Sequence, residues 1–591
     1  MSRSDNLLPK VFLKMAIFDA FSDITGGSSS FLSHWNNVPL RTVYQAKDYH
    51  FVSPLLKILN QNLQLSLSSR DLQFYFAKNF QDFTVYVDQS RNLVFSLKSE
   101  FQFEILRKNF LFLAKRKFIF LRKVAQQDPV LGNFVEKKIS LEYVSANPTG
   151  FIHLGHLRNG VIGQQLSYLY LLLGNRVRKV FFLNDLGEQM TTFSQEILDY
   201  FQKKKNVETR SVYLNSALTD LLKKSGLVQA IVNESSKKIV IRLLTHFMRL
   251  QLQKQLSWLR IFFDAVDSES LLYKSSLATD FFCSLEKKKS ISLSQDAVWL
   301  KIGNYFDQKD DKVLVKRNWK TTYFLSDIIY HLTKLKADDT VIGIFGADHA
   351  DHLLKVKLAL ELINPQFAQR VVVVLLQMIR MKTDWEEAKK LSKRRGWLVT
   401  SDEIRKIFSP DLFRFLIFSY PLGKQIVINR KSFLAVSSQK VNSYFYLKYV
   451  FFRADQIIKK AGKILFGLKK NDNYSSLFRQ LIASKEIKKK CHPFSPSEAL
   501  LGRIVFESYE RILSAAASQD PSLILSAMKM VARVFHSFYQ NNRILDLSPK
   551  KKGKEKIANW NGLLLILNIR ELFLFLAELL GFNHFASPDI V

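Results

Sequence analysis

Residues 145–156 read SANPTGFIHLGH, and they lie between a predicted strand at 141–144 and a predicted helix at 155–173. Pro148 and Gly150 make the chain turn ahead of the helix. A helix N-terminus presents free N–H groups and the positive end of the helix dipole, which suits a bound phosphate. A strand, a turn and a helix in this order therefore predict a phosphate site in an α/β domain.

Two histidines stand at the start of this helix. If the helix has already begun at His153, then His153 and His156 share one face and can donate hydrogen bonds to one triphosphate. Gly155 between them allows a close approach of the backbone. The alternative interpretation is a helix-capping turn that carries two ordinary histidines.

The chain divides into three predicted segments. In the middle segment, 126–410, the apolar stretches at 341–345 and 371–376 are rich in β-branched residues, as buried parallel strands are. Residues 179–183 are a further strand candidate. This segment is predicted to be α/β.

The flanking segments differ from the middle one. Segment 1–125 mixes helical periodicity with alternating stretches at 83–87 and 93–97, which predicts a small α+β domain. Segment 411–591 is rich in Leu, Phe, Lys and Ala at helical spacing, which predicts an all-α helical bundle with an amphipathic helix at 563–580.

A second candidate phosphate element, KLSKR, occurs at 390–394. Taken alone, it is one more basic loop. Lys390 and Lys393, on either side of Ser392, can offer two cations to the phosphates that the histidines bind, on a loop that closes over ATP.

Composition favours a polyanionic partner. Lys and Arg total 87 against 52 Asp and Glu, and the formal net charge is +35. Nucleic acid is the first candidate, although a Lys-rich codon bias gives the same charge without a partner. The only cysteines, Cys283 and Cys491, exclude a disulfide framework and a zinc site built on paired cysteines. The longest purely apolar run, 371–376, is far below the roughly 20 residues that span a bilayer.

The two phosphate elements together resemble those of class I aminoacyl-tRNA synthetases. His-Leu-Gly-His at 153–156 is similar to their HIGH element, and 390–394 is similar to their KMSKS element. The surroundings resemble bacterial arginyl-tRNA synthetases, over residues 126–591 well and over the first 125 weakly. The similar stretches are EYVSANPTG at 142–150, FLNDLGEQ at 182–189, FD at 263–264 with SES at 268–270, YFLSDI at 323–328, GADH at 346–349 and DLFR at 411–414.

This resemblance implies a Rossmann-like catalytic domain with a parallel sheet, an N-terminal domain that contacts the tRNA elbow, and a C-terminal anticodon-binding domain of the DALR type. It implies that ATP activates L-arginine as arginyl-adenylate and that arginine then passes to the terminal ribose of tRNA(Arg). The protein is expected to be a cytoplasmic monomer with no membrane association.

The resemblance also assigns residues. The catalytic groups would be His153, His156, Lys390 and Lys393, and ATP would also contact Gly155, Asp348, His349 and Ser392. An arginine guanidinium carries five N–H donors, so its binding site needs carboxylates that accept pairs of parallel hydrogen bonds. The residues that the resemblance implies for arginine binding are Asn147, Glu269, Tyr323, Asp327 and Asp348. Magnesium would arrive with ATP. Although Asp348, His349, Asp351 and His352 also suggest a metal site, no structural metal is expected.

In the helical segment, tyrosines and arginines are candidates for RNA contacts. Tyr446, Tyr449 and Tyr539 would stack on unpaired bases, and Arg453 and Arg543 would contact phosphates. Core packing between helices is the alternative role of each aromatic ring.

Two other functions stay open: a class I synthetase for another amino acid, and a non-catalytic tRNA-binding relative. The chain also departs from the family at three places, and one of them is the absence of the Pro-Gly-Phe-Ile-Asn run that the family has near residues 78–92. Leu391 replaces a methionine, and Asn318-Trp319 stands where Asp-Gly is usual, so that a tight turn is lost or rebuilt there.

Overall fold

The structure is a computed structural model, and it describes residues 41–45, 48–53, 83–87, 93–114, 119–128, 131–149, 152–186, 188–202, 222–229, 237–272, 277–302, 311–382, 401–467, 474–484, 486–490, 492–546 and 556–586. The chain forms two compact units. One comprises Met1–Val135 with Ser438–Val591, and the other comprises Glu136–Ser437.

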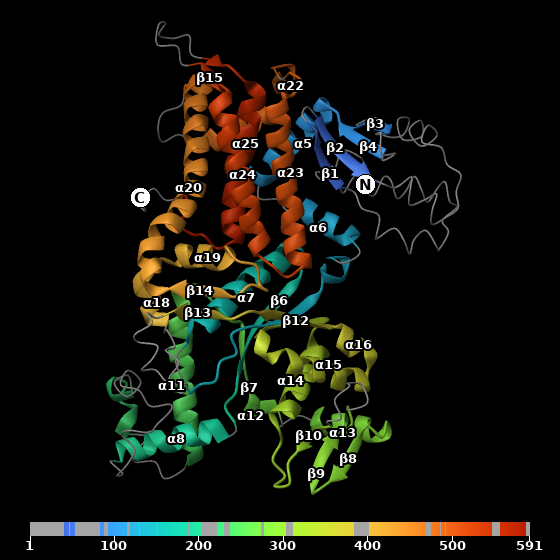
Figure 1. Ribbon diagram of the computed structural model, residues 1–591, viewed down its shortest axis with the longest axis vertical. Helices are drawn as coiled ribbons and strands as arrows, with labels where there is room; N and C mark the ends of the chain where they lie inside the picture. The colour runs from blue at the N-terminus through green and yellow to red at the C-terminus, as the bar shows by residue number, and fades with distance from the viewer. Residues whose placement is uncertain are drawn as a thin grey trace, which may run out of the picture. The chain divides into compact units, whose positions relative to one another are not determined.

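A five-stranded parallel sheet organises the unit Glu136–Ser437 (Figure 1). Its strands run in the order β12-β11-β5-β6-β7, and each neighbouring pair is parallel. The strands are β5 (Lys138–Glu142), β6 (Arg176–Leu183), β7 (Ala265–Ser268), β11 (Thr340–Gly346) and β12 (Val371–Leu376). The predicted Rossmann-like α/β class is confirmed.

The predicted strands at 179–183, 341–345 and 371–376 each lie within one of these strands. The strand expected at 141–144 ends earlier, at Glu142. Val144 and Ser145 have φ values of 70° and 38°, which an extended strand excludes. The chain therefore leaves the sheet at the start of the loop that leads to the histidines.

Helices and smaller strands surround this sheet. The helices are α7 (Leu154–Leu172), α8 (Glu188–Phe201), α11 (Lys237–Ser257), α12 (Glu269–Leu272), α13 (Leu277–Lys287), α14 (Tyr323–Ala337), α15 (Ala350–Ile363), α16 (Pro365–Gln369), α18 (Ser401–Ile407) and α19 (Pro410–Phe418). A three-stranded antiparallel sheet consists of β8 (Ile291–Ser294), β9 (Ala297–Leu300) and β10 (Lys312–Val315), and β13 (Ile379–Lys382) pairs in parallel with β14 (Ile426–Asn429).

Helix α7 lies tightly against the end of β5 because one of its residues has no side chain. A Cβ atom on Gly163 would come within 2.3 Å of the Tyr143 ring. The Tyr143 hydroxyl donates a hydrogen bond to the backbone carbonyl of Phe262, 2.8 Å away. This close contact holds the start of α7 at the carboxyl end of the sheet, where open α/β sheets bind ligands.

The turn in front of α14 is rebuilt without Asp-Gly. The Lys316 N–H donates to the carbonyl of Lys320, and the Trp319 N–H donates to the carbonyl of Lys316, both at 2.9 Å. Trp319 takes a φ of 57°, the left-handed conformation that glycine adopts without strain. The departure in sequence therefore keeps the turn.

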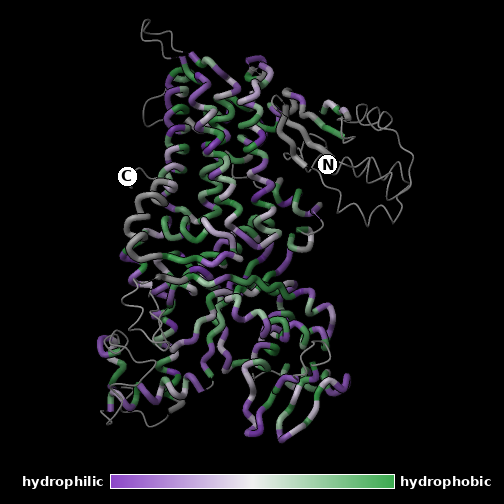
Figure 2. Tube along the Cα trace, in the orientation of Figure 1, coloured by the Kyte–Doolittle hydropathy of each residue, from purple (hydrophilic) through white to green (hydrophobic). Residues whose placement is uncertain are grey.

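The other unit combines an antiparallel sheet with a helical bundle. The sheet order is β1-β2-β4-β3, and the strands predicted at 83–87 and 93–97 are confirmed as β3 and β4. Figure 2 shows hydrophobic and hydrophilic residues alternating along the bundle helices. The strands are β1 (Arg41–Gln45), β2 (Asp48–Ser53), β3 (Phe83–Val87), β4 (Leu93–Leu97), β15 (Leu545–Asp546) and β16 (Lys556–Ile557). The helices are α5 (Ser99–Ala114), α6 (Ile119–Gln127), α21 (Tyr474–Ala483), α22 (Glu486–Lys490), α23 (Pro496–Ala517), α24 (Ser522–Asn541) and α25 (Trp560–Leu579). Helix α20 (Arg430–Phe466) begins in the residues assigned to the unit Glu136–Ser437 and ends in those assigned to this unit.

The segment that begins at Asp411 packs within the unit of the parallel sheet. Arg414 of α19 is 2% exposed and donates to Gln165 Oε1 of α7 at 2.8 Å and to the carbonyl of Leu259. Burial lowers the pKa of Arg414 to about 10. The predicted division at 125 and 410 into three functional domains stays a prediction.

Within the described ranges, no helix combines the length and the apolar character that crossing a membrane requires.

Candidate active site

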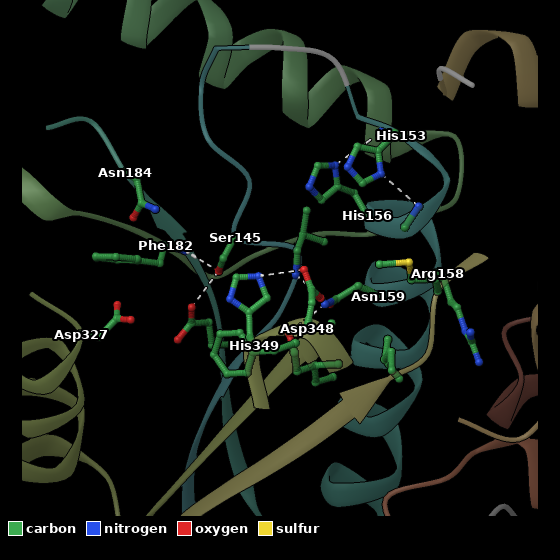
Figure 3. Close-up of a pocket in the computed structure, with 18 of the residues that line it drawn as sticks. Ser145, His153, His156, Arg158, Asn159, Phe182, Asn184, Asp327, Asp348 and His349 are labelled. Atoms are coloured by element: carbon green, nitrogen blue, oxygen red, sulfur yellow. Dashed lines mark hydrogen bonds and ion pairs between the residues drawn. The ribbon is translucent and has the colours of Figure 1, made fainter. Parts of the chain in front are cut away.

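The two histidines both cap α7 and line a cavity. His153 is the N-cap residue, and its Nδ1 accepts a hydrogen bond from the Gly155 N–H at 3.1 Å. His156 Nδ1 accepts from the His153 N–H at 3.4 Å. The two rings stack with their centroids 3.7 Å apart, and Figure 3 shows them side by side. The two histidines therefore cap the helix, and their binding of phosphate stays a prediction.

These contacts assign the neutral tautomer of both rings. Because each Nδ1 accepts a hydrogen bond, the ring proton of each neutral imidazole lies on Nε2. Burial lowers the pKa of His153, and burial together with the neighbouring His153 ring lowers the pKa of His156 to about 3. Two neutral rings therefore present N–H donors to the cavity without the repulsion that two stacked imidazolium ions would cause.

Protonation of these rings couples pH to stability. In the unfolded chain His156 takes up a proton near pH 6.5, whereas in the folded protein its pKa is about 3. His156 therefore leaves the free energy of unfolding unchanged above pH 6.5 and lowers it as the pH falls toward 3, because the unfolded state then binds more protons than the folded state. In a His156→Asn variant, the free energy of unfolding is expected to fall less steeply with pH than in wild type, by up to about 1.4 kcal/mol per pH unit between pH 6 and 5. Urea denaturation at each pH measures it, and an unchanged slope would contradict the neutral assignment.

A cavity of about 460 Å³ opens beside the histidine pair at the carboxyl end of the sheet. Asp348 and His349 line it from the 3₁₀ turn after β11, with His349 Nε2 3.9 Å from Asp348 Oδ2. A Cβ atom on Gly346 would come within 2.3 Å of Asp348 Oδ1, so glycine lets this carboxylate fold back over the strand end. In Figure 3 Asp327 lies at the left and the histidine pair lies to its upper right, with His349 between them.

A second cavity, of about 1130 Å³, shares part of its wall with the first. The residues common to both are Ser145, His156, Asn184, Tyr323 and His349. Asn147 and Glu269 line only the larger cavity, whereas Asp327 and Asp348 line only the smaller one. The structure thus brings all five residues expected to hold arginine to two adjoining cavities.

Two buried carboxylates lie where arginine is predicted to bind. Glu269 is 8% and Asp327 is 7% exposed. Burial raises the pKa of Glu269 and of Asp327, and a hydrogen bond from His352 to Asp327 opposes the rise at Asp327. Buried carboxylates of this kind are stabilised by a bound cation.

Neighbouring side chains hold the predicted residues in place. His352 Nε2 lies 2.6 Å from Asp327 Oδ2, and the Tyr323 ring packs 5.1 Å from the His352 ring. Asn147 Nδ2 donates to Gln189 Oε1 at 2.8 Å, and Asn147 Oδ1 accepts from Asn184 Nδ2 at 3.0 Å. Sequence reasoning placed His352 only near a possible metal site; its spacing from Asp327 gives no signal of this contact.

A buried ion pair beneath the cavity was also missed. Lys334 Nζ lies 2.6 Å from Glu142 Oε2, with the side chains 1% and 4% exposed. Glu142 Oε1 accepts from the Ser145 hydroxyl at 2.9 Å, and the Ser145 oxygen accepts from the Phe182 N–H at 3.2 Å. The pair fixes the loop that carries Asn147. Its members are 192 residues apart in sequence, so no local pattern could reveal it.

Removing one partner of this pair is expected to be costly. A Lys334→Met variant leaves Glu142 buried without its cation, which typically destabilises by about 3–5 kcal/mol. The matched control is Lys336→Met, because Lys336 and its partner Asp280 are both 62% exposed; it should cost less than about 1 kcal/mol. Urea denaturation compares the two, and equal stabilities would refute a structural role for the buried pair.

Other predicted residues lie elsewhere. Lys390, Ser392 and Lys393 fall outside the described residues. The RNA candidates belong to the unit that contains the helical bundle. Tyr446 and Tyr449 are 39% and 49% exposed. In the described ranges, no group of three or more His, Cys, Asp or Glu side chains could hold a metal ion.

Four of the five RNA candidates make contacts with aromatic rings. Tyr446 and Tyr449 of α20 both stack on His536 of α24, with ring centroids 4.3 Å and 5.3 Å apart. The Arg453 guanidinium lies 4.7 Å from the centre of the Tyr539 ring and donates to its hydroxyl. Arg543 is paired with Asp546 at 2.8 Å. Tyr446 and Tyr449 therefore both pack between helices and stay partly exposed.

Two family profiles match the chain. The profile described as "tRNA synthetases class I (R), catalytic domain" matches residues 121–406, and the "DALR anticodon binding domain" matches residues 447–583.

Similar proteins carry the corresponding names. The arginine–tRNA ligase of Mesomycoplasma hyopneumoniae is 27% identical over 448 residues, covering 73% of this chain and 78% of that protein. The arginine–tRNA ligase of Helicobacter pylori is 29% identical over 446 residues, covering 71% and 75%. The solved structure of the Thermus thermophilus arginyl-tRNA synthetase has a TM-score of 0.63 at 16% identity and covers 97% of this chain and 99% of that one. At 16% identity, this structural similarity shows that the two chains share a fold and nothing more.

Proposed function

Because the chain belongs to the class I arginyl-tRNA synthetases, we propose that it is an arginine–tRNA ligase. In the first step a carboxylate oxygen of L-arginine attacks the α-phosphorus of ATP, the bond to the β-phosphate breaks, and pyrophosphate leaves. In the second step a hydroxyl of the terminal ribose of tRNA(Arg) attacks the carbonyl carbon of arginyl-adenylate, and AMP leaves. No covalent enzyme intermediate is needed.

One observation carries this proposal: a cavity lined by two neutral imidazoles adjoins a cavity wall lined by buried carboxylates. Neutral N–H donors and a helix N-terminus suit a triphosphate. Buried Asp327 and Glu269 suit a guanidinium, which pairs with carboxylates through two parallel hydrogen bonds. A single ligand that spans both regions is an amino-acid adenylate with a cationic side chain.

In the proposed site, His153 and His156 hold ATP phosphates through Nε2–H, with Gly155 leaving the backbone of the first helical turn accessible. Asp348 and His349 contact the nucleotide and the amino-acid end of arginine. Magnesium reaches the site bound to ATP. Lys390, Ser392 and Lys393 complete the phosphate contacts, with Lys393 stabilising the charge that develops at the α-phosphate.

The arginine side chain is proposed to lie with its guanidinium between Asp327 and Glu269 and its stem along Tyr323. Asn147 is proposed to contact the amino-acid end, and the hydrogen bonds that orient its amide toward Gln189 and Asn184 support this role. The protein is proposed to act as a monomer in the cytoplasm, with Tyr446, Tyr449, Arg453, Tyr539 and Arg543 contacting tRNA.

ATP–pyrophosphate exchange tests the activation step. Exchange is expected with arginine, and the assay includes bulk tRNA because the family resemblance implies that activation requires it. Citrulline, which has the shape of arginine but a neutral urea end, is the matched control and should support exchange at least about 10²-fold less well, since the buried carboxylates then lose a charged partner. The absence of exchange with any amino acid would favour a non-catalytic relative that binds tRNA.

A further inference from the structure

An exposed tryptophan stands on the wall of the larger cavity. Trp319 is 77% exposed, the highest value among the large hydrophobic side chains of the described residues. It lies in the turn between β10 and α14, and it lines the cavity of about 1130 Å³ together with Lys316, Lys320 and Thr321. Glu269, which is proposed to hold the guanidinium, lines the same cavity.

The position of Trp319 is unfavourable for a residue without a function. Its φ of 57° belongs to the left-handed region, where a bulky residue is an outlier and glycine is favoured. The side chain gains no burial in return, because all five residues from Lys316 to Lys320 are exposed. Sparsely populated backbone conformations of this kind concentrate at ligand-binding positions.

The cavity has room for more than an amino acid. Its volume of about 1130 Å³ exceeds the roughly 300–1,000 Å³ of typical small-molecule sites. Two lysines flank the indole, so the wall combines a flat aromatic surface with positive charge. Proteins that bind single-stranded nucleic acid use this combination: bases stack on aromatic rings and cations follow the phosphates.

We propose that the Trp319 indole is the platform on which the 3′-terminal base of the RNA stacks, with Lys316 and Lys320 contacting the adjoining phosphates. This inference rests on the proposed transfer of arginine to a terminal ribose. That transfer requires the last nucleotide of the RNA to lie beside the adenylate, and the larger cavity shares Ser145, His156 and His349 with the cavity proposed to hold ATP. Stacking fixes the base and leaves the ribose hydroxyls free to react.

The experiment compares two RNAs and three variants of the full-length protein. Equilibrium binding is measured with fluorescently labelled tRNA(Arg) that ends in its terminal adenosine and with the same tRNA lacking that nucleotide. Trp319→Gly removes the ring while suiting the left-handed turn, and Trp319→Tyr keeps an aromatic ring. Leu293→Ala is the matched control, because Leu293 of β8 is 73% exposed and lines neither cavity.

Wild-type protein should bind the complete tRNA about tenfold more tightly than the truncated one, the size expected for one base–aromatic stack. Trp319→Gly should abolish this preference, Trp319→Tyr should retain most of it, and Leu293→Ala should leave it unchanged. In charging assays, Trp319→Gly should lower kcat/KM for tRNA by a similar factor while the KM for arginine stays within twofold.

Two results would overturn the inference: an unchanged preference in Trp319→Gly, or an equal loss of affinity for both RNAs. Failure of the proposed function is recognised separately, because wild-type protein would then attach no arginine to the complete tRNA, whatever the Trp319 variants do.

Discussion

An Asp327→Ala variant is expected to lose at least about 30-fold in kcat/KM for arginine while its KM for ATP changes little. Asp327 is 7% exposed and is held by His352, so its carboxylate is desolvated before arginine arrives. Truncating one partner of a buried, hydrogen-bonded charge pair typically costs 2–5 kcal/mol or more, which is roughly 30-fold to several thousandfold. The loss should fall on arginine binding, because Asp327 lies at the far end of the site from the histidines.

Steady-state charging kinetics with arginine and ATP varied in turn measure this effect. Asp327→Asn separates charge from shape, since it keeps the size of the side chain and should still raise the KM for arginine strongly. Asp351→Ala is the matched control, because Asp351 is 71% exposed, pairs with Lys355 and lines neither cavity. A KM for arginine within a few-fold of wild type in both Asp327 variants would remove Asp327 from the arginine site.

The same carboxylate predicts a pH dependence. Burial raises the pKa of Asp327 above its ordinary value of 3.8, and only the ionised form pairs with a guanidinium. The KM for arginine is therefore expected to rise as the pH falls through this raised pKa, at a higher pH than an ordinary aspartate would give. Substrate kinetics between pH 8 and 5 measure the rise.

A Lys393→Ala variant is expected to lower aminoacylation by at least ~10²-fold, in the range of a lost transition-state donor. The proposed role of Lys393 is to stabilise negative charge on the α-phosphate as pyrophosphate leaves, so the loss should appear in kcat. Lys393→Arg keeps the charge and should recover part of the rate.

Single-turnover charging isolates this step from product release. Lys389→Ala, a change just ahead of the KLSKR element in the same basic run, is the control and should stay within a few-fold of wild type. Should Lys393→Ala behave like this control, the transition-state role would be lost and the phosphate contacts would rest on the histidines alone.

Much of the fold could be predicted because its determinants are local. The β-branched stretches at 341–345 and 371–376 are long enough and apolar enough to identify buried strands. The start of α7 was predictable within one residue from the turn residues before it. The end of β5 was not, because the positive φ of Val144 and Ser145 follows from tertiary contacts with the loop and leaves no mark in the sequence.

The site was predicted in part for a similar reason. Chemically distinctive residues such as His153 and His156 identify themselves by type and spacing. The residues that hold them in place do not: Lys334 and Glu142 meet only through the fold, and His352 reaches Asp327 from the next helix. Sequence reasoning also treated capping and phosphate binding as alternatives, whereas a histidine with two ring nitrogens can do both.

The tryptophan at 319 shows how a departure from a family pattern becomes informative. In the sequence it suggested only that a tight turn is lost or rebuilt. In the structure the turn is intact, and the ring is exposed on a cavity wall. The residue therefore matters for ligand binding and not for the formation of the turn.

The most direct test of the central claim is to offer the purified protein bulk tRNA and ATP with each of the twenty amino acids in separate reactions and to measure acid-precipitable product. A pocket of neutral imidazoles joined to buried carboxylates predicts that arginine alone is attached in quantity. Attachment of another amino acid in preference to arginine would contradict the account.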